Sequence, residues 1–237
     1  MHTELSRLID IAASIATSGR WAAVNAEVER LAANPGEGNA WYAEVLGSLC
    51  FQVFSEYLLL KAAYEEKPEG DCSLLAWRAR NLLELSVWSI YSANDRHNAR
   101  RLYEDAGRDV LGVVDAFIKW GTASAQGADW LGPLEQAKDD LTRRATLNGI
   151  DSLDGSYKKV SNAAKECGIG SQFSLSFKML SKFTHPTAMR ILAGADEAKN
   201  ALLRDLFFSN GCLYFVGAFE ALERQLIDRE QKHSPSA

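Results

Sequence analysis

The sequence predicts an all-α fold, and three observations lead to that prediction. The chain has 237 residues, 47% of them hydrophobic and 24% charged, which is ordinary for a soluble globular protein with a sizeable core. Only five prolines occur, and the stretches between breakers repeat apolar residues at helical spacing. No sustained strand alternation bounded by turn signals is present. We therefore expect a single multi-helix domain over residues 1–237.

The N-terminal segment, residues 1–36, is predicted to form a helical hairpin. Thr3 can cap a first helix that ends near Ser18. A second helix then runs from about Arg20 to Ala33 and ends before Asn34-Pro35-Gly36. Both helices carry mixed polar and apolar surfaces.

Two long helices are expected to follow and to form the core. The first, Asn39 to about Glu66, repeats apolar residues at i, i+3, i+4 and i+7, and Lys67-Pro68-Glu69-Gly70 closes it. The second, Leu74 to Tyr91, is apolar almost all the way round. A helix of that kind is typically central and buried.

Arg80 and Glu84 are the exceptions on this second helix, four residues apart and therefore on one face. Ionisable side chains seldom enter apolar surroundings unless they are paired, because a lone buried charge costs several kcal/mol or more. The pair is either a structural ion pair or the floor of a site, and the sequence leaves both alternatives open.

A fifth helix, about Asp95 to Ser124, is strongly polar in its first half and apolar from Val110 to Trp120. Its basic cluster, Arg96 to Arg101, is followed at once by acidic residues, which favours an ordinary salt-bridged helix start over a nucleic-acid surface. Residues 125–156 loosen around a short charged helix from Gln136 to Arg144, and we expect a peripheral helical insertion there.

Three further helices complete the predicted domain: Ser156 to Glu166, Ser171 to Thr184, and a last long helix from about Ala195 to Glu230. Residues 231–237 are expected to be a flexible tail. His185 precedes Pro186 and should therefore lie at the C-terminal end of its helix, because the residue before a proline avoids the α region.

On the helix that ends at His185, four polar residues align: Ser174, Lys178, Ser181 and His185. Such a row of a cation, two hydroxyls and an imidazole is able to bind an anion or a phosphodiester. The alternative is a solvated face, with His185 favoured by the helix dipole at the C-terminus.

Composition and spacing exclude several classes of function. The net charge of −5 gives no broad electrostatic footprint for nucleic acid or for a membrane surface. No signal peptide and no uninterrupted apolar run of spanning length are evident, so we expect a cytoplasmic protein without a membrane partner. The four cysteines lack metal-ligand spacing and the common catalytic signatures are missing, so we expect neither metal nor cofactor.

Two short motifs, Arg80-Asn81-Leu82-Leu83-Glu84 and, about 100 residues later, Ser181-Lys182-Phe183-Thr184-His185-Pro186, carry a resemblance to a known family. The chain resembles a bacterial helical domain-of-unknown-function family with an Arg-x3-Glu helix and a Ser-x3-His-Pro element. The resemblance covers about Ala40 to Glu223 and implies that Arg80, Glu84, Ser181 and His185 converge in the fold.

More distantly, the chain is similar to the HEPN superfamily, helical bundles that often act as metal-independent ribonucleases in toxin and antiphage systems. This similarity implies an HEPN-like core and makes His185 the match for the histidine of the Arg-x4-6-His motif. The arginine has no counterpart, because Lys178 lies seven residues before His185 and Lys182 three residues before it. Arg80 would then have to supply the cation from another helix.

Two functions are therefore expected, from different classes. The first is an interaction or ligand-binding module, with a homodimer or a partner protein as its partner and a buried Arg80/Glu84/Ser181/His185 polar cluster. The second is a metal-independent ribonuclease, with His185 as general acid or base, Arg80 or Lys178 stabilising phosphate charge and Glu84 orienting Arg80. RNA is a partner only in the second case.

Overall fold

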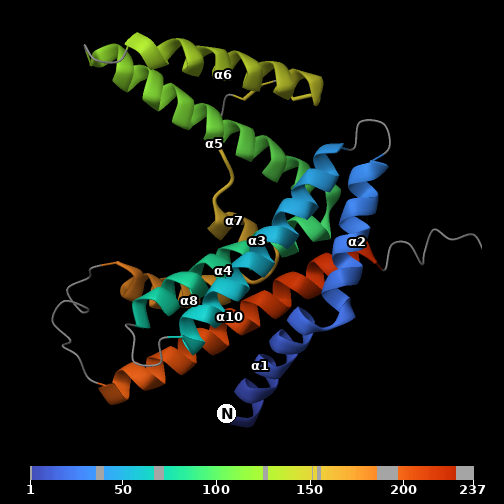
Figure 1. Ribbon diagram of the computed structural model, residues 1–237, viewed down its shortest axis with the longest axis vertical. Helices are drawn as coiled ribbons and strands as arrows, with labels where there is room; N and C mark the ends of the chain where they lie inside the picture. Colours follow the sequence, from blue (N-terminus) through green and yellow to red (C-terminus); the bar gives the residue numbers. More distant parts are fainter. Residues whose placement is uncertain are drawn as a thin grey trace, which may run out of the picture.

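The structure is a computed structural model that describes residues 2–35, 40–66, 72–124, 128–150, 152–153, 156–185 and 197–227. Every regular element in these ranges is a helix, which confirms the predicted all-α class (Figure 1). The helices are α1 (His2–Thr17), α2 (Gly19–Ala33), α3 (Ala40–Glu65), α4 (Cys72–Asn94), α5 (Arg96–Ala123), α6 (Ala128–Leu147), α7 (Val160–Glu166), α8 (Gly170–Thr184) and α10 (Glu197–Leu226).

The centre of the bundle is α4, which packs along α10 and also contacts α3, α5, α7 and α8 (Figure 1). Aromatic residues join α3 to α10, where the ring of Tyr57 stacks on that of Phe215 with centroids 4.1 Å apart. Gly211 brings the α10 backbone close to α3, because a Cβ at that position would lie 2.2 Å from Leu60 Cδ2. Close packing of this kind makes these three helices the core of the domain.

The prediction that the Leu74–Tyr91 helix is central is therefore correct, but its first turns are not fully buried. Leu74 is 39% exposed and Trp77 is 45% exposed. These two residues share one face, which the described helices leave open. The guanidinium of Arg78 lies 4.4 Å from the Trp77 ring centroid and covers it in part.

The predicted N-terminal hairpin is wrong, because α1 and α2 run end to end with a bend between them (Figure 1). Only Ser18 separates the two helices, and one residue is too short a loop to reverse the chain. Ser18 instead caps α2, and its Oγ accepts a hydrogen bond from the Arg20 backbone N–H at 3.3 Å. As a result α1 packs on α10, and α2 packs on α3.

The second half of α5 leaves the bundle and pairs with α6 to form a projecting hairpin (Figure 1). The expected insertion at 125–156 thus contains a longer helix than predicted, which begins at Ala128 and includes Pro133. Pro133 is the sixth residue of α6 and cannot donate to the Asp129 carbonyl, so α6 continues through it at the loss of one backbone hydrogen bond. Residues 125–127, 151 and 154–155 lie outside the described ranges.

The polar first half of α5 is held by ion pairs, as the sequence predicted. Asp105 is buried and accepts a hydrogen bond from Arg108 Nη1 at 2.7 Å and from the Lys158 backbone N–H at 2.8 Å. Arg100 and Arg101 donate to the backbone carbonyls of Asn148 and Ser156, both at 2.6 Å. Through these hydrogen bonds the two arginines of α5 hold the segment of chain that comes after α6.

One helix in the described part of the chain, α3, is long and apolar enough to cross a membrane by length and composition alone. A core helix of a globular bundle has the same composition, and α3 buries side chains such as Leu46, Val53 and Leu60 in the core. The predicted tail, residues 231–237, lies outside the described residues.

Candidate functional site

Arg80 and Glu84 form an ion pair in the middle of α4, with Arg80 Nε 3.2 Å from Glu84 Oε1. The pair is less enclosed than the sequence predicted. The Arg80 side chain is 22% exposed and that of Glu84 34% exposed, because α8 covers only one flank of this part of α4. The two charges therefore lie at the edge of the bundle, where solvent reaches them.

Helix α8 packs against α4 and brings Phe177 and His185 to Arg80. Phe177, Ser181 and His185 are spaced at i, i+4 and i+8 and so follow one side of α8. The guanidinium carbon of Arg80 lies 4.4 Å from the Phe177 ring centroid, and its Nη1 lies 3.1 Å from His185 Nε2. Arg80 therefore reaches residues on both sides of Ser181 along α8.

The position of His185 follows from its neighbour in the sequence, as predicted. Helix α8 ends at Thr184, and His185 adopts an extended conformation with φ −109° and ψ 155° as its C-terminal cap. The side chain is exposed to solvent. Because a guanidinium only donates hydrogen bonds, Nε2 of His185 must be the acceptor, which leaves the proton of the neutral ring on Nδ1.

Ser181 is the unusual member of this group. Its Oγ is buried, and no hydrogen-bond partner for it is found among the described residues. Leaving a buried hydroxyl without a partner costs about 1–3 kcal/mol. The Nε of Arg80 is also buried without hydrogen-bond geometry, since its contact with Glu84 is close but poorly directed. Both atoms have hydrogen-bonding capacity that the described protein groups do not use.

The structure thus brings together Arg80, Glu84 and His185 by direct contacts and sets Ser181 on the same side of α8. We call these four residues the polar cluster. Lys178 does not contact it within the described part of the chain. It is exposed on α8 and lies seven residues before His185, about 10 Å along the helix axis. Ser174 is likewise exposed. Of the predicted polar row, Ser181 and His185 therefore belong to the polar cluster, whereas Ser174 and Lys178 face solvent.

Phe177 is the participant that the sequence did not single out for a site. In the sequence it belongs to the apolar stripe of the predicted helix. In the structure it is half-buried and packs against the hydrophobic core. The Phe177 ring also packs against the Arg80 guanidinium, and a cation–π contact of this kind contributes roughly 0.5–2 kcal/mol of stabilisation. The sequence did contain an indication of this contact, because Phe177 lies four residues before Ser181 and therefore on the same side of the helix.

Three of the four cysteines have raised pKa values, which makes them poor candidates for a second reactive site. Burial raises the pKa of the Cys50 thiol to about 12 and that of Cys212 to about 12. Burial and the neighbouring Glu166 also raise the pKa of Cys167. Thiols with raised pKa values are poor nucleophiles. No group of three or more His, Cys, Asp or Glu side chains in the described residues is placed to hold a metal ion.

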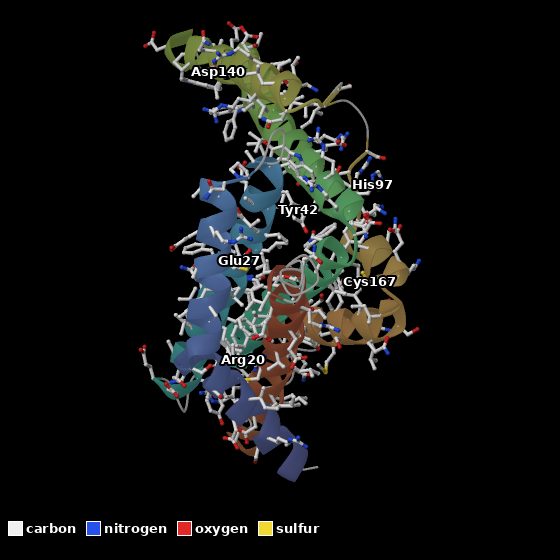
Figure 2. The ribbon with its side chains drawn as sticks, turned by 90° about the vertical axis from the view of Figure 1, so that its right-hand side faces the viewer. Arg20, Glu27, Tyr42, His97, Asp140 and Cys167 are labelled. Carbon is white, nitrogen blue, oxygen red and sulfur yellow. The ribbon has the colours of Figure 1, made fainter. Side chains whose placement is uncertain are left out.

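The basic residues at the start of α5 are engaged in the structure, as shown above for Arg100 and Arg101. Arg96 lies over the rings of Trp41 and Tyr42, at 5.4 and 5.0 Å from their centroids. Figure 2 shows His97 on the outside of α5, where the chain enters this helix. The polar cluster is therefore the better candidate site.

Comparisons of the chain with protein-family models, with curated proteins and with solved structures find no match.

Proposed function

We propose that this protein is a ligand-binding helical-bundle protein whose polar cluster binds a phosphate group. The observation that carries the proposal is the Ser181 hydroxyl, which is buried and without a hydrogen-bond partner among the described residues. Ser181 lies on α8 between Phe177 and His185, the two residues that Arg80 contacts. Hydroxyl and guanidinium groups are both hydrogen-bond donors, and a phosphate offers several acceptor oxygens at once.

The charges of the cluster support an anion of this kind. Arg80 supplies the permanent positive charge, and its planar fork is suited to two oxygens of one phosphate. His185 presents the Nδ1–H donor from the exposed end of α8. Glu84 and Phe177 restrain the arginine from two sides, which reduces the entropy that binding has to remove.

Titration of inorganic phosphate into the protein, followed by calorimetry at constant ionic strength, tests this proposal. We expect Arg80→Met to weaken binding at least about tenfold, since it removes a charge-assisted hydrogen bond of roughly 1.5–3 kcal/mol. Ser181→Ala should weaken binding by roughly two- to tenfold, equivalent to about 0.5–1.5 kcal/mol.

Arg78→Met is the matched control for this titration. Arg78 lies on the same helix, but it pairs with Glu56 of α3 at 3.1 Å and makes no contact with the polar cluster in the described part of the chain. Phosphate affinity should therefore survive this change. Equal affinity in all variants, or no binding by the wild-type protein, would contradict the proposal.

A second candidate function, metal-independent RNA cleavage, is favoured by one observation: the exposed His185 lies within 3.1 Å of Arg80. In this reaction Arg80 Nη1 moves from His185 Nε2 to the phosphate, and the freed Nε2 accepts the proton of the ribose 2′-hydroxyl as that oxygen attacks phosphorus. The bond from phosphorus to the 5′-oxygen breaks, and the 5′-oxygen takes up a proton from water. Arg80 stabilises the charge that develops on the phosphate, and Glu84 orients Arg80. Lys178 would contact the backbone of a longer RNA.

RNA integrity and growth of bacteria that produce the wild-type protein or His185→Ala separate the two functions. Fragmentation and toxicity that disappear in the variant would support the ribonuclease. Intact RNA with both proteins, repeated with purified protein and RNA in the presence of a chelator, would leave phosphate binding as the function. The acidic net charge of −5 favours that second outcome.

A further inference from the structure

We propose that α5 carries a homodimer interface, independent of the polar cluster, in which its projecting half packs antiparallel against the same helix of a second copy. The surface consists of Val110, Val113, Phe117 and Trp120, which we call the open stripe. Their exposed fractions are 52%, 56%, 52% and 63%. Spaced at i, i+3, i+7 and i+10, they follow the repeat of a helix that packs on another helix.

The projecting half of α5 has two apolar stripes; α6 covers one of them and contacts the other only at Trp120. The covered stripe contains the half-buried Leu111, Val114 and Ile118 and the buried Gly121. A Cβ on Gly121 would lie 2.5 Å from the ring of Trp130 in α6, which shows how closely the two helices approach. The open stripe lies about 100° further round α5, and the described helices leave most of its surface uncovered. Trp120 stacks on Trp130 of α6, with ring centroids 5.4 Å apart, and is still 63% exposed.

The hairpin extends far from the bundle, so a second molecule has room to approach it. Figure 2 shows Asp140 of α6 at the far end of the molecule from α1. At the root of the hairpin the open stripe continues into a cleft of about 350 Å³ between α3, α5 and α6. Val110 belongs both to the stripe and to the mostly apolar lining of this cleft.

The charges around the open stripe are compatible with burial. Asp115 and Lys119 are the charged residues between Val110 and Trp120, and both project from the opposite side of α5. Asp115 is paired there with Lys138 of α6 at 2.8 Å. On the side of the stripe away from α6 the neighbours are Gly112 and Ala116, small residues that allow another helix to come close.

A second copy fits the open stripe because an antiparallel arrangement makes it self-complementary. Val110 then faces Trp120 of the other copy, and Val113 faces Phe117. Each small side chain meets a large one, which is how facing core positions fill space. A two-fold axis generates both pairs twice, as in most homodimers.

The area is sufficient for a modest dimer. Full burial covers roughly 150–250 Å² for an aromatic side chain and roughly 60–120 Å² for a valine. At the observed exposures the open stripe therefore contributes roughly 240–420 Å² per chain. Interfaces are about 60% apolar, so the total area buried on both copies is roughly 800–1,400 Å². A specific interface needs roughly 1,000 Å².

Sedimentation velocity of the full chain between about 1 and 100 μM tests the interface. We expect the mass to rise toward twice that of the monomer with concentration, and Phe117→Glu to weaken dimerisation at least tenfold. Leu175→Glu is the control, since Leu175 is 74% exposed on α8, outside the open stripe. A wild-type monomer at every concentration, or equal effects of the two variants, would overturn the proposal.

A mixing experiment tests the antiparallel pairing. Val113→Lys and Phe117→Glu should each weaken self-association while retaining native circular dichroism. Mixed together they should form a heterodimer, because the new lysine then faces the new glutamate and the second Val113–Phe117 pair is intact. Two folded variants that stay monomeric when mixed would rule out this pairing.

Discussion

Arg80 makes three contacts that restrain it without enclosing it: an ion pair with Glu84, a ring contact with Phe177 and a hydrogen bond with His185. A structural ion pair and a binding site differ in what happens when one partner is removed. A buried pair that loses one charge destabilises a protein by about 3–5 kcal/mol. A half-exposed pair with a spacing of four residues contributes about 0.3–0.5 kcal/mol.

We therefore expect Arg80→Met and Glu84→Gln each to lower the free energy of unfolding by about 1 kcal/mol or less. Urea denaturation of the two variants and of wild type measures this. In the same preparations Arg80→Met should bind phosphate poorly. A loss of 3 kcal/mol or more in either variant would identify the pair as a structural element of the bundle.

Individual residues of the polar cluster were predictable from helical spacing. Their convergence was expected only from the resemblance to a helical family, because spacing within one helix cannot predict contacts between helices. Arg80 with Glu84 and Ser181 with His185 each lie within one helix, where spacing determines which side chains are neighbours. Which side of α8 meets α4 depends on packing between distant segments. For the same reason the sequence could not separate Lys178, which is exposed, from Ser181, which is buried at its Oγ.

Among the helices, the packing of α10 against α3 depends on one glycine. A Cβ at Gly211 would lie 2.2 Å from Leu60 Cδ2, whereas a Cβ at Gly217 on the same helix would have nothing within 4 Å. We expect Gly211→Ala to destabilise the protein by about 1–2 kcal/mol, because overpacking outweighs the gain in helix propensity.

Gly217→Ala is the matched control and should stabilise the protein by about 0.5–1 kcal/mol. Thermal or urea unfolding of the two variants compares them directly. Equal shifts for both substitutions would show that α10 does not approach α3 as closely as described.

The presence of the helices was predictable from the periodicity of apolar residues. The course of the chain between α1 and α2 and at Gly132-Pro133 was not. The break between α1 and α2 looked like a turn, but Ser18 alone separates them, and one residue yields a bend. Gly132-Pro133 looked like a breaker, yet α6 continues through Pro133, its sixth residue, at the loss of one backbone hydrogen bond. In neither case did the residue type alone determine whether the chain turned or the helix ended.

At the scale of the whole molecule, several buried tyrosines make stability depend on alkaline pH. The hydrogen bond to Asp205 raises the pKa of Tyr64 to about 12, and burial raises the pKa values of Tyr57, Tyr103 and Tyr214. Unfolded tyrosines ionise near pH 10. Between about pH 10 and 12 the unfolded state therefore binds fewer protons than the folded state, and stability falls as the pH rises.

We expect the urea midpoint to be constant below about pH 8 and to fall above it, first because the unfolded Cys50 and Cys212 thiols ionise near pH 8.5 and then because the unfolded tyrosines ionise near pH 10. Tyr64→Phe should reduce the steepness of the fall, since phenylalanine cannot ionise. Urea titrations at several alkaline pH values check this. A midpoint that does not change up to pH 11 would contradict the burial of these hydroxyls.

The molecule as a whole then has two separate surfaces: the polar cluster between α4 and α8, and the open stripe on the projecting α5. The most direct test of the central claim is a crystal structure obtained with phosphate. We predict phosphate oxygens within about 2.7–3.2 Å of an Arg80 Nη atom and of Ser181 Oγ. A cluster in which Arg80 still contacts His185 while phosphate binds elsewhere, or nowhere, would contradict it.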